Sequence, residues 1–317
     1  MLTEVERAVT RALPYGCSVL VAVSGGGDSV CLLATIARLA SVRSYHVVAA
    51  HVDHAARPES GEDAAFVTAL CSQLGIHSCH HRRLEAVPRG VNAESWWRAE
   101  RYQFFGEVMQ AEGLDRLVTA HHRDDLVETV LSRLVMNREL VGPEDLSIRR
   151  GLARPFLSLS KETLIATLGA WGISWREDAS NALVDRTRNR VRHRLIPQLR
   201  DEFGVSSQAL FEQASRLSED ARMLWRITEQ MTAELDGMPV GAPEWTRRLS
   251  KIVTANEAPL QWRIVSMALL SMVGYPLGPR HGARFVRFLL GSRREFQAAG
   301  GITIIKHQGG LMRSGEE

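Results

Sequence analysis

The sequence is poor in lysine, in closely spaced cysteines and in long apolar runs. Only three of its 39 basic residues are lysine, and none of its four cysteines belongs to a CxxC pair, which argues against a zinc knuckle or a disulfide scaffold. No stretch approaches the roughly 18 uninterrupted apolar residues of a membrane-spanning helix. The first residues carry Glu and Arg where a signal peptide needs an apolar core, so we expect a cytoplasmic protein with no membrane partner.

Positive charge is concentrated in the middle of the chain. The formal net charge of the 317 residues is only +3. Between Arg149 and Arg194, however, ten basic residues accompany four acidic ones, whereas residues 201–317 carry 14 basic and 13 acidic residues. A polyanionic partner would therefore contact the middle of the chain.

Apolar strand patterns that alternate with helical patterns predict an α/β fold, a doubly wound and mostly parallel Rossmann-like sheet. The expected strands are 18–23, 45–52, 76–80 and 116–119, and the expected helices are 28–40, 61–74, 92–112, 124–136, 161–171 and 189–200, with a loop at 141–151. Later patterns are mainly helical (208–235, 260–272 and 280–290) before a strand at 301–305. We therefore predict a catalytic domain over 1–203 and a smaller, mainly helical C-terminal domain over 204–317.

A glycine-rich loop, Ser24-Gly25-Gly26-Gly27-Asp28-Ser29, follows the first expected strand. Its glycines let the backbone approach a ligand closely, and the N–H groups at the start of the next helix favour an anion. The loop matches neither the lysine-bearing phosphate loop nor the dinucleotide GxGxxG pattern. It resembles the SGGxDS loop of the PP-loop ATP pyrophosphatases, which implies that these six residues bind the pyrophosphate of ATP together with Mg2+.

Further motifs resemble one branch of that superfamily, the tRNA(Ile)-lysidine synthetases. His51-Val-Asp53-His54 is similar to the HxDH motif of this family, and residues 94–102, which include Arg98, are similar to its ExxxRxxRY helix. Residues 120–129 are similar to its GHHxxDxxET segment, and later motifs at 154–157, 175–181 and 188–192 follow in family order. The resemblance covers residues 18 to about 200.

The resemblance implies an ATP-dependent ligase that modifies tRNA. ATP would adenylate the C2 oxygen of the wobble cytidine of tRNA(Ile) with a CAU anticodon, and the amine of free lysine would then displace AMP. His51, Asp53 and His54 would bind ATP together with the glycine loop. The expected catalytic residues are Asp28, Arg98, Asp125 and Glu128.

Asp125 and Glu128 lie three residues apart at the start of an expected helix, so both carboxylates can face one small cation. We expect this pair to bind the lysine substrate and to accept its proton. A solvated helix face is the alternative interpretation. A metal site is another alternative, because His and carboxylate side chains at strand ends suit zinc or iron. Its candidate ligands are His51, Asp53, His54, His121 and His122, but such a site would leave the glycine loop unexplained.

Arginines are dense near the end of the expected catalytic domain, and guanidinium groups suit phosphate contacts. The expected tRNA-binding residues are Arg188, Asn189, Arg190, Arg192 and Arg194. The alternative is an arginine-rich helix that pairs with nearby acidic residues, namely Glu177, Asp178 and Asp185. A second basic cluster at 280–294 is interleaved with phenylalanine and is equally typical of an amphipathic helix.

The chain departs from the family pattern in two places. The glycine of the GHH motif is Ala120, and the glycine-rich loop of the family is replaced by residues 134–146, which are rich in Asn, Glu, Pro and Asp. Two other functions therefore stay open: a protein that binds tRNA or ATP without lysidine chemistry, and a related adenylating enzyme with a different nucleophile. A sulfur-transferring enzyme of the second kind needs paired cysteines, which this sequence does not place close together.

Overall fold

The computed structural model describes residues 2–53, 60–85, 87–88, 93–140, 151–176, 186–298 and 301–315. The chain divides into two compact units: Met1–Ser132 with Arg149–Ala214, and Arg133–Ile148 with Ser215–Glu317. Helix α10 (Ser207–Thr232) belongs to both, so the change of unit after Ala214 falls within a helix. In the described part of the chain, no helix is both long and apolar enough to cross a membrane.

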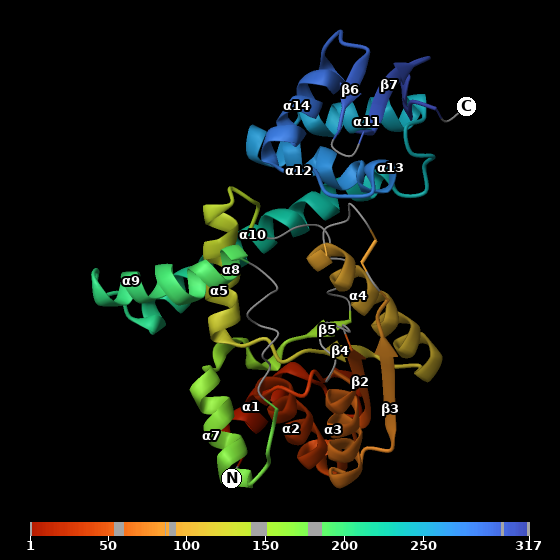
Figure 1. Cartoon of the computed structure of the whole chain (residues 1–317). Coiled ribbons are helices and arrows are strands. Elements are labelled where there is room, and N and C mark those ends of the chain that lie inside the picture. Colours follow the sequence, from red (N-terminus) through yellow and green to blue (C-terminus); the bar gives the residue numbers. More distant parts are fainter. Residues whose placement is uncertain are drawn as a thin grey trace. The chain divides into compact units, whose positions relative to one another are not determined.

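The first unit is built on a parallel five-stranded sheet, which confirms the predicted fold class (Figure 1). Its strands are β1 (Ser18–Ala22), β2 (His46–Asp53), β3 (Ser78–Arg83), β4 (Arg116–Val118) and β5 (Leu152–Ala153), in the order β3-β2-β1-β4-β5. The central strand β1 is in register with both neighbours, Ala22 with Ala50 and Val21 with Val118. The carboxyl ends of β2, β1 and β4 therefore meet at one edge of the sheet.

Apolar residues on both faces of β1 explain why helices cover both sides of the sheet. Val19 and Val21 belong to an apolar core that includes residues of α1 (Glu4–Ala12), α2 (Gly27–Arg43), α3 (Ser60–Gln73) and α7 (Lys161–Trp171). Leu20 belongs to a second core with Phe104 and Phe105 of α4 (Ala93–Glu112). Because successive strand residues point to opposite faces, this pattern produces a doubly wound fold.

Helix α1 and strand β5 of the first unit are not among the predicted elements. Helix α1 begins with a capping box, in which Thr3 and Glu6 satisfy each other's backbone N–H groups. Strand β5 has only two residues, too few for a periodic pattern. The predicted loop at 141–151 lies, apart from Gly151, outside the described residues.

The second unit is mainly helical, as predicted, and also contains a small antiparallel sheet. Its further helices are α11 (Pro243–Thr254), α12 (Ala258–Ala268), α13 (Leu270–Val273) and α14 (Pro279–Leu290). The sheet consists of β6 (Glu295–Gln297), β7 (Thr303–His307) and β8 (Gly310–Arg313). The sequence predicted a strand at 301–305 but neither of its partners. The arginines of α14 are exposed and its phenylalanines are buried, so the helix is amphipathic.

The described start of the altered loop packs within the second unit. The carboxylate of Glu139 pairs with the guanidinium of Arg263, and both side chains are largely buried. Arg263 also lies over the ring of Trp262, 4.3 Å from its centre, and Leu140 packs beside Trp262 and Trp225. Residues that replace the glycine-rich loop of the family therefore contribute to this core.

Candidate active site

Three chain segments meet at the carboxyl edge of the first unit's sheet. The glycine loop follows β1, β2 ends at Asp53, and β4 is followed by residues 119–122 and by α5 (Arg123–Val135). Because β2, β1 and β4 are neighbours, this edge collects the predicted ATP-binding and lysine-binding residues. His54 lies outside the described residues.

Glycines and hydroxyls shape the loop after β1. Gly25 has a φ of +93°, a left-handed conformation that favours glycine. The Ser29 hydroxyl donates to the Gly26 carbonyl at 2.9 Å and accepts from the Ser24 N–H at 3.1 Å. Gly26 caps α2 without a side-chain hydrogen bond, so the first-turn N–H groups of α2 are available to an anionic ligand.

Residues from later parts of the chain pack tightly against the glycine loop. A Cβ atom at Gly27 would lie 2.6 Å from Cδ1 of Ile165 in α7 and 3.3 Å from Cδ1 of Trp175. The Arg176 N–H donates to the Gly25 carbonyl at 3.0 Å, and the Arg176 guanidinium pairs with acidic residues at the start of α3. Segments distant in sequence thus fix the position of the loop.

His122 lies among three carboxylates. Its Nε2 is 3.5 Å from Asp28 Oδ2 and 3.4 Å from Asp125 Oδ2, and its Nδ1 is 3.3 Å from Asp124 Oδ2. Burial lowers the pKa of His122, but the carboxylates of Asp124, Asp28 and Asp125 outweigh burial and raise the pKa to about 10. His122 is therefore a cation at neutral pH, and it connects the glycine loop to α5.

One oxygen of Asp28 has no partner among the described residues. Its Oδ1 is buried without a hydrogen bond, whereas Oδ2 faces His122. Asp28 stands in the first turn of α2, beside the N–H groups that suit an anion. A carboxylate oxygen in this position fits Mg2+, which proteins often hold through one or two carboxylates together with phosphate oxygens. Within the described ranges, no group of three or more His, Cys, Asp or Glu side chains could hold a metal ion by itself.

Asp125 and Glu128 both bind one cationic group, the guanidinium of Arg188 from the same chain. Arg188 donates through Nη2 to Asp125 Oδ1 at 2.5 Å and through Nε to Glu128 Oε2 at 2.9 Å. Arg192 donates to Glu128 through Nε at 2.5 Å and through Nη2 at 2.8 Å. Burial raises the pKa of Asp125, but the charges of His122 and Arg188 outweigh burial and hold it below its ordinary value. The predicted lysine-binding pair therefore contacts two of the predicted tRNA-binding residues.

The arginine-rich segment has two faces. It forms α8 (Arg186–Arg190), a π-helical turn over Val191–Leu195 and α9 (Ile196–Asp201). Arg188 and Arg192, one turn apart, face the carboxylates, whereas Arg190 and Arg194 are exposed and Asn189 is half-buried. The acidic residues considered as alternative partners, Glu177, Asp178 and Asp185, lie outside the described residues.

Strand β2 contributes a buried histidine and a buried aspartate. His51 Nδ1 is 2.8 Å from the Val23 carbonyl, so Nδ1 carries the hydrogen and Nε2 is an acceptor. This Nε2 is buried and has no hydrogen-bond partner among the described residues. Asp53 Oδ2 lies 3.7 Å from Arg83 Nε. The strand thus offers an unoccupied acceptor near the carboxyl edge.

Two residues of this region, His121 and Arg154, are not part of the predicted site, and the predicted residue Arg98 lies beside an aromatic ring. Arg98 lies on α4 with its guanidinium 5.0 Å from the centre of the Tyr102 ring, and its catalytic role stays a prediction. Burial lowers the pKa of His121, and the positive charges of Arg154 and Arg101 lower it further. No local pattern indicates that these distant segments meet, and the sequence therefore assigns neither His121 nor Arg154 to ATP, lysine or tRNA.

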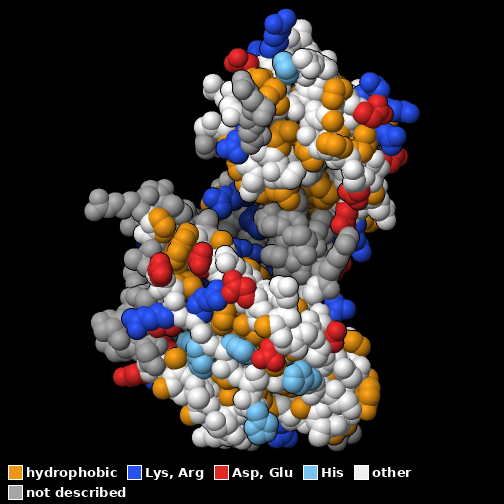
Figure 2. Space-filling model, turned by 90° about the vertical axis from the view of Figure 1, so that its right-hand side faces the viewer, with side chains coloured by type: hydrophobic (Ala, Val, Ile, Leu, Met, Phe, Trp, Pro, Cys, Tyr) orange, Lys and Arg blue, Asp and Glu red, His pale blue; other side chains and the backbone are white. Residues whose placement is uncertain are grey.

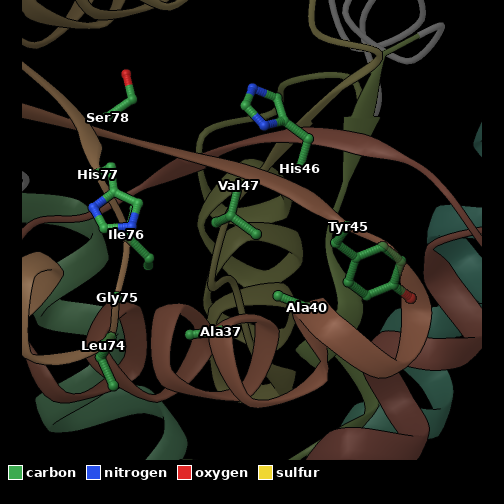
Figure 3. A pocket seen from close by; sticks show the side chains of 10 residues that line it. All are labelled: Ala37, Ala40, Tyr45, His46, Val47, Leu74, Gly75, Ile76, His77 and Ser78. Atoms are coloured by element: carbon green, nitrogen blue, oxygen red, sulfur yellow. The ribbon is translucent and has the colours of Figure 1, made fainter.

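A cavity of about 230 Å³ lies at the opposite edge of the sheet (Figure 3). The first residues of β2 and β3 line it together with α2, and the apolar side chains of Val47 and Ile76 lie across from Ala37 and Ala40. None of the predicted site residues lines this cavity. The candidate site is therefore defined by the loops at the carboxyl edge.

A glycine loop at the start of a helix, at the carboxyl edge of a parallel sheet, defines an anion-binding α/β domain. The family model of the PP-loop domain matches residues 1–199, and the chain belongs to this family. It is 37% identical to the tRNA(Ile)-lysidine synthase of Bacillus subtilis over 226 residues, which make up 68% of this chain and 47% of that protein.

Other relatives carry the same name. The tRNA(Ile)-lysidine synthase of Geobacillus kaustophilus is 33% identical over 288 residues, 86% of this chain and 61% of that protein. The chain thus spans about half to two thirds of the length of these curated relatives. A solved structure, the U34-tRNA thiolase NcsA from Methanococcus maripaludis, is similar in fold, with a TM-score of 0.58 and 16% identity over 68% of this chain and 79% of that chain.

Proposed function

We propose that the chain catalyses ATP-dependent attachment of free lysine to C2 of the wobble cytidine in tRNA(Ile) with a CAU anticodon. Its membership of the PP-loop family and its similarity to several tRNA(Ile)-lysidine synthases support this proposal. The substrates are ATP, lysine and tRNA, and we place the reaction in the cytoplasm, where all three occur.

In the first step, the C2 oxygen of the cytidine attacks the α-phosphorus of ATP, and the bond to pyrophosphate breaks. The first-turn N–H groups of α2 and the hydroxyls of Ser24 and Ser29 would donate to the departing phosphate oxygens. Asp28 would hold Mg2+, which when bound neutralises charge on the pyrophosphate. His51 Nε2 would accept a hydrogen bond from the nucleotide.

In the second step, the ε-amine of lysine attacks C2, the bond from C2 to the AMP oxygen breaks, and the amine loses a proton. One observation carries the proposal: Asp125 and Glu128, which His122 connects to the glycine loop, jointly hold a cationic group. The ammonium group of lysine has the same charge as the Arg188 guanidinium and would compete for the same oxygens. The ammonium group must lose one proton before it can attack as an amine, and a carboxylate of this pair would receive that proton. The second proton, released after the attack, would pass to water.

Two assays on the full chain test the proposal, lysine incorporation into a tRNA(Ile) transcript and tRNA-dependent exchange of pyrophosphate into ATP. Asp125→Asn and Glu128→Gln should each lower lysine incorporation by about a hundredfold or more, because both the cation site and the proton acceptor are lost. Exchange should persist in both variants, which also shows that they are folded. Glu107→Gln, which alters a carboxylate paired with Arg82 at the surface, should change neither activity.

The outcomes distinguish the alternatives. The wild-type chain could exchange pyrophosphate but incorporate another nucleophile in place of lysine. This result would mean that the altered loop accompanies a change of the nucleophile that the enzyme uses. ATP binding with neither exchange nor incorporation would identify a binding protein. Either result would overturn the proposal.

A further inference from the structure

The guanidinium of Arg154 has a buried N–H group without a protein partner. Its Nε is buried and accepts no contact from any hydrogen-bond acceptor within the described ranges, although the residue is partly exposed. In the described part of the chain, no acidic side chain pairs with it, whereas Arg188 and Arg192 pair with carboxylates. A buried N–H of a permanently charged group costs free energy when it stays unsatisfied, so Arg154 indicates a place where an anionic ligand binds.

Hydrogen bonds place Arg154 next to the residues that precede α5. Arg154 directly follows β5, and the Thr119 N–H, which follows β4, donates to the Ala153 carbonyl at 3.1 Å. The Thr119 hydroxyl is in turn 2.9 Å from His121 Nδ1. Because β4 and β5 are parallel neighbours, Arg154 and His121 both lie at the carboxyl edge of the sheet.

The segment after Arg154 also packs against the start of α5. A short 3₁₀ helix follows Arg154, and just beyond it the Leu159 carbonyl accepts a hydrogen bond from the Arg123 N–H at 2.9 Å. Arg123 is the first residue of α5, the helix that carries Asp125 and Glu128. Arg154 and this carboxylate pair therefore belong to two adjacent connections, one after β5 and one after β4.

The surroundings of His121 agree with this placement. Burial lowers the pKa of His121, the positive charge of Arg154 lowers it further, and the negative charge of Asp125 opposes both effects. Because charge interactions weaken with distance, a histidine that responds to both groups lies close to both. A free guanidinium and a carboxylate thus flank the same histidine.

Other basic side chains of the first unit have acidic neighbours. Arg82 pairs with Glu107, and Arg176 pairs with Asp63. Figure 2 shows basic and acidic side chains interspersed over the face that it presents. Arg154 differs from these arginines, and a bound ligand would supply the negative charge that its own surroundings lack.

We propose that Arg154 binds the α-carboxylate of the free lysine substrate and thereby makes the enzyme specific for an amino acid instead of a simple amine. This inference rests on the proposed function, in which Asp125 and Glu128 bind the ε-amine. Lysine carries its amine and its carboxylate at opposite ends of a flexible four-carbon stem, so one molecule offers a cation to the pair and an anion to Arg154. The fork of N–H groups on a guanidinium can bind both oxygens of a carboxylate. Arg154 would act in lysine binding and not in adenylation.

The test compares lysine with cadaverine, the diamine that lysine becomes when it loses its carboxylate, in the tRNA(Ile) incorporation assay with the full chain. In Arg154→Gln, we expect the KM for lysine to rise about tenfold or more, because charge-assisted hydrogen bonds are lost. The kcat for lysine, the kcat/KM for cadaverine and the tRNA-dependent exchange of pyrophosphate should stay close to the wild-type values. A merely structural role of Arg154 would lower all of these activities together.

A second variant, a second substrate and a control sharpen the test. Arg154→Lys keeps the charge but loses the planar fork, so its KM for lysine should lie between those of the wild type and Arg154→Gln. This variant also replaces Arg154→Gln if circular dichroism shows that the latter does not fold. Lysinamide, whose carboxylate is a neutral amide, should have a raised KM with the wild-type chain. Arg11→Gln, at an exposed arginine of α1, is the matched control and should use both amines as the wild type does.

Three results would overturn the inference. The first is an unchanged KM for lysine in Arg154→Gln. The second is an equal loss of activity with lysine and with cadaverine. The third is a loss of pyrophosphate exchange in folded Arg154 variants, which would show that Arg154 binds a phosphate of ATP or of tRNA. A wild-type chain that incorporates neither amine would instead overturn the proposed function, and the inference with it.

Discussion

Glu128 and Arg192, which are 64 positions apart in the sequence, form a bidentate ion pair. Arg192 Nε lies 2.5 Å from Glu128 Oε1, and Arg192 Nη2 lies 2.8 Å from Oε2. Only 3% of the Glu128 side chain is exposed, so its charge depends on Arg192 and Arg188 for compensation. The pair therefore contributes to the stability of the fold.

Removal of this pair should destabilise the first unit. We expect Arg192→Met to lower the free energy of unfolding by about 2–3 kcal/mol, because a buried carboxylate loses two charge-assisted hydrogen bonds. Arg190→Met changes an exposed arginine of the same segment and should alter the free energy of unfolding by less than about 0.5 kcal/mol. Urea denaturation followed by circular dichroism measures both values. Equal, small effects would show that Arg192 is not a structural partner of Glu128.

The arginine segment shows where prediction from the sequence stops. The order of strands and helices, and the shared face of Asp125 and Glu128, follow from local patterns, so they could be predicted. The identity of the cation between them could not, because Arg188 lies 63 positions from Asp125. Alternate arginines indicated a phosphate-binding stretch, but helical geometry turns Arg188 and Arg192 to one side and leaves Arg190 on the other.

His122 illustrates the same limit. The sequence shows His122 beside two aspartates, but its raised pKa also depends on Asp28, which comes from a different strand–helix connection. Such properties arise from tertiary contacts and have no local signature.

The charge on His122 should make stability depend on pH. The pKa of His122 rises from an ordinary value of 6.5 to about 10 in the folded chain. Its stabilising effect is therefore complete below pH 6.5 and is lost as the pH rises toward 10. Over this interval the free energy of unfolding should fall by a few kcal/mol more in the wild-type chain than in His122→Gln, which has no group to titrate at this position. Urea denaturation at a series of pH values checks this difference, and parallel curves for the two proteins would contradict it.

Close packing behind the glycine loop yields a rescue experiment. In Gly27→Ala, the new methyl group would come within 2.6 Å of Ile165 Cδ1, so the Ile165 side chain or the helix that carries it must shift. We expect ATP to bind about fivefold more weakly, which corresponds to about 1 kcal/mol of overpacking. Ile165→Val removes the clashing methyl group, so the double variant should regain most of the affinity, while Ile165→Val alone stays close to wild type. Titration calorimetry with a non-hydrolysable ATP analogue measures the affinity of all four proteins. If the double variant binds as weakly as Gly27→Ala, the strain lies at Trp175 instead.

The exposed arginines should act on tRNA without affecting stability. Arg190 and Arg194 are exposed on the segment in which Arg188 and Arg192 bind carboxylates, so their guanidinium groups can reach phosphates. Replacement of both by alanine should weaken tRNA binding and reduce the slope of log affinity against log salt concentration by about 1–2, since each lost phosphate contact removes roughly one released counterion. Arg11→Ala, at an exposed arginine of α1, is the control and should leave the slope unchanged. Filter binding at several salt concentrations provides the slopes, and an unchanged slope in the double variant would assign tRNA binding to another surface.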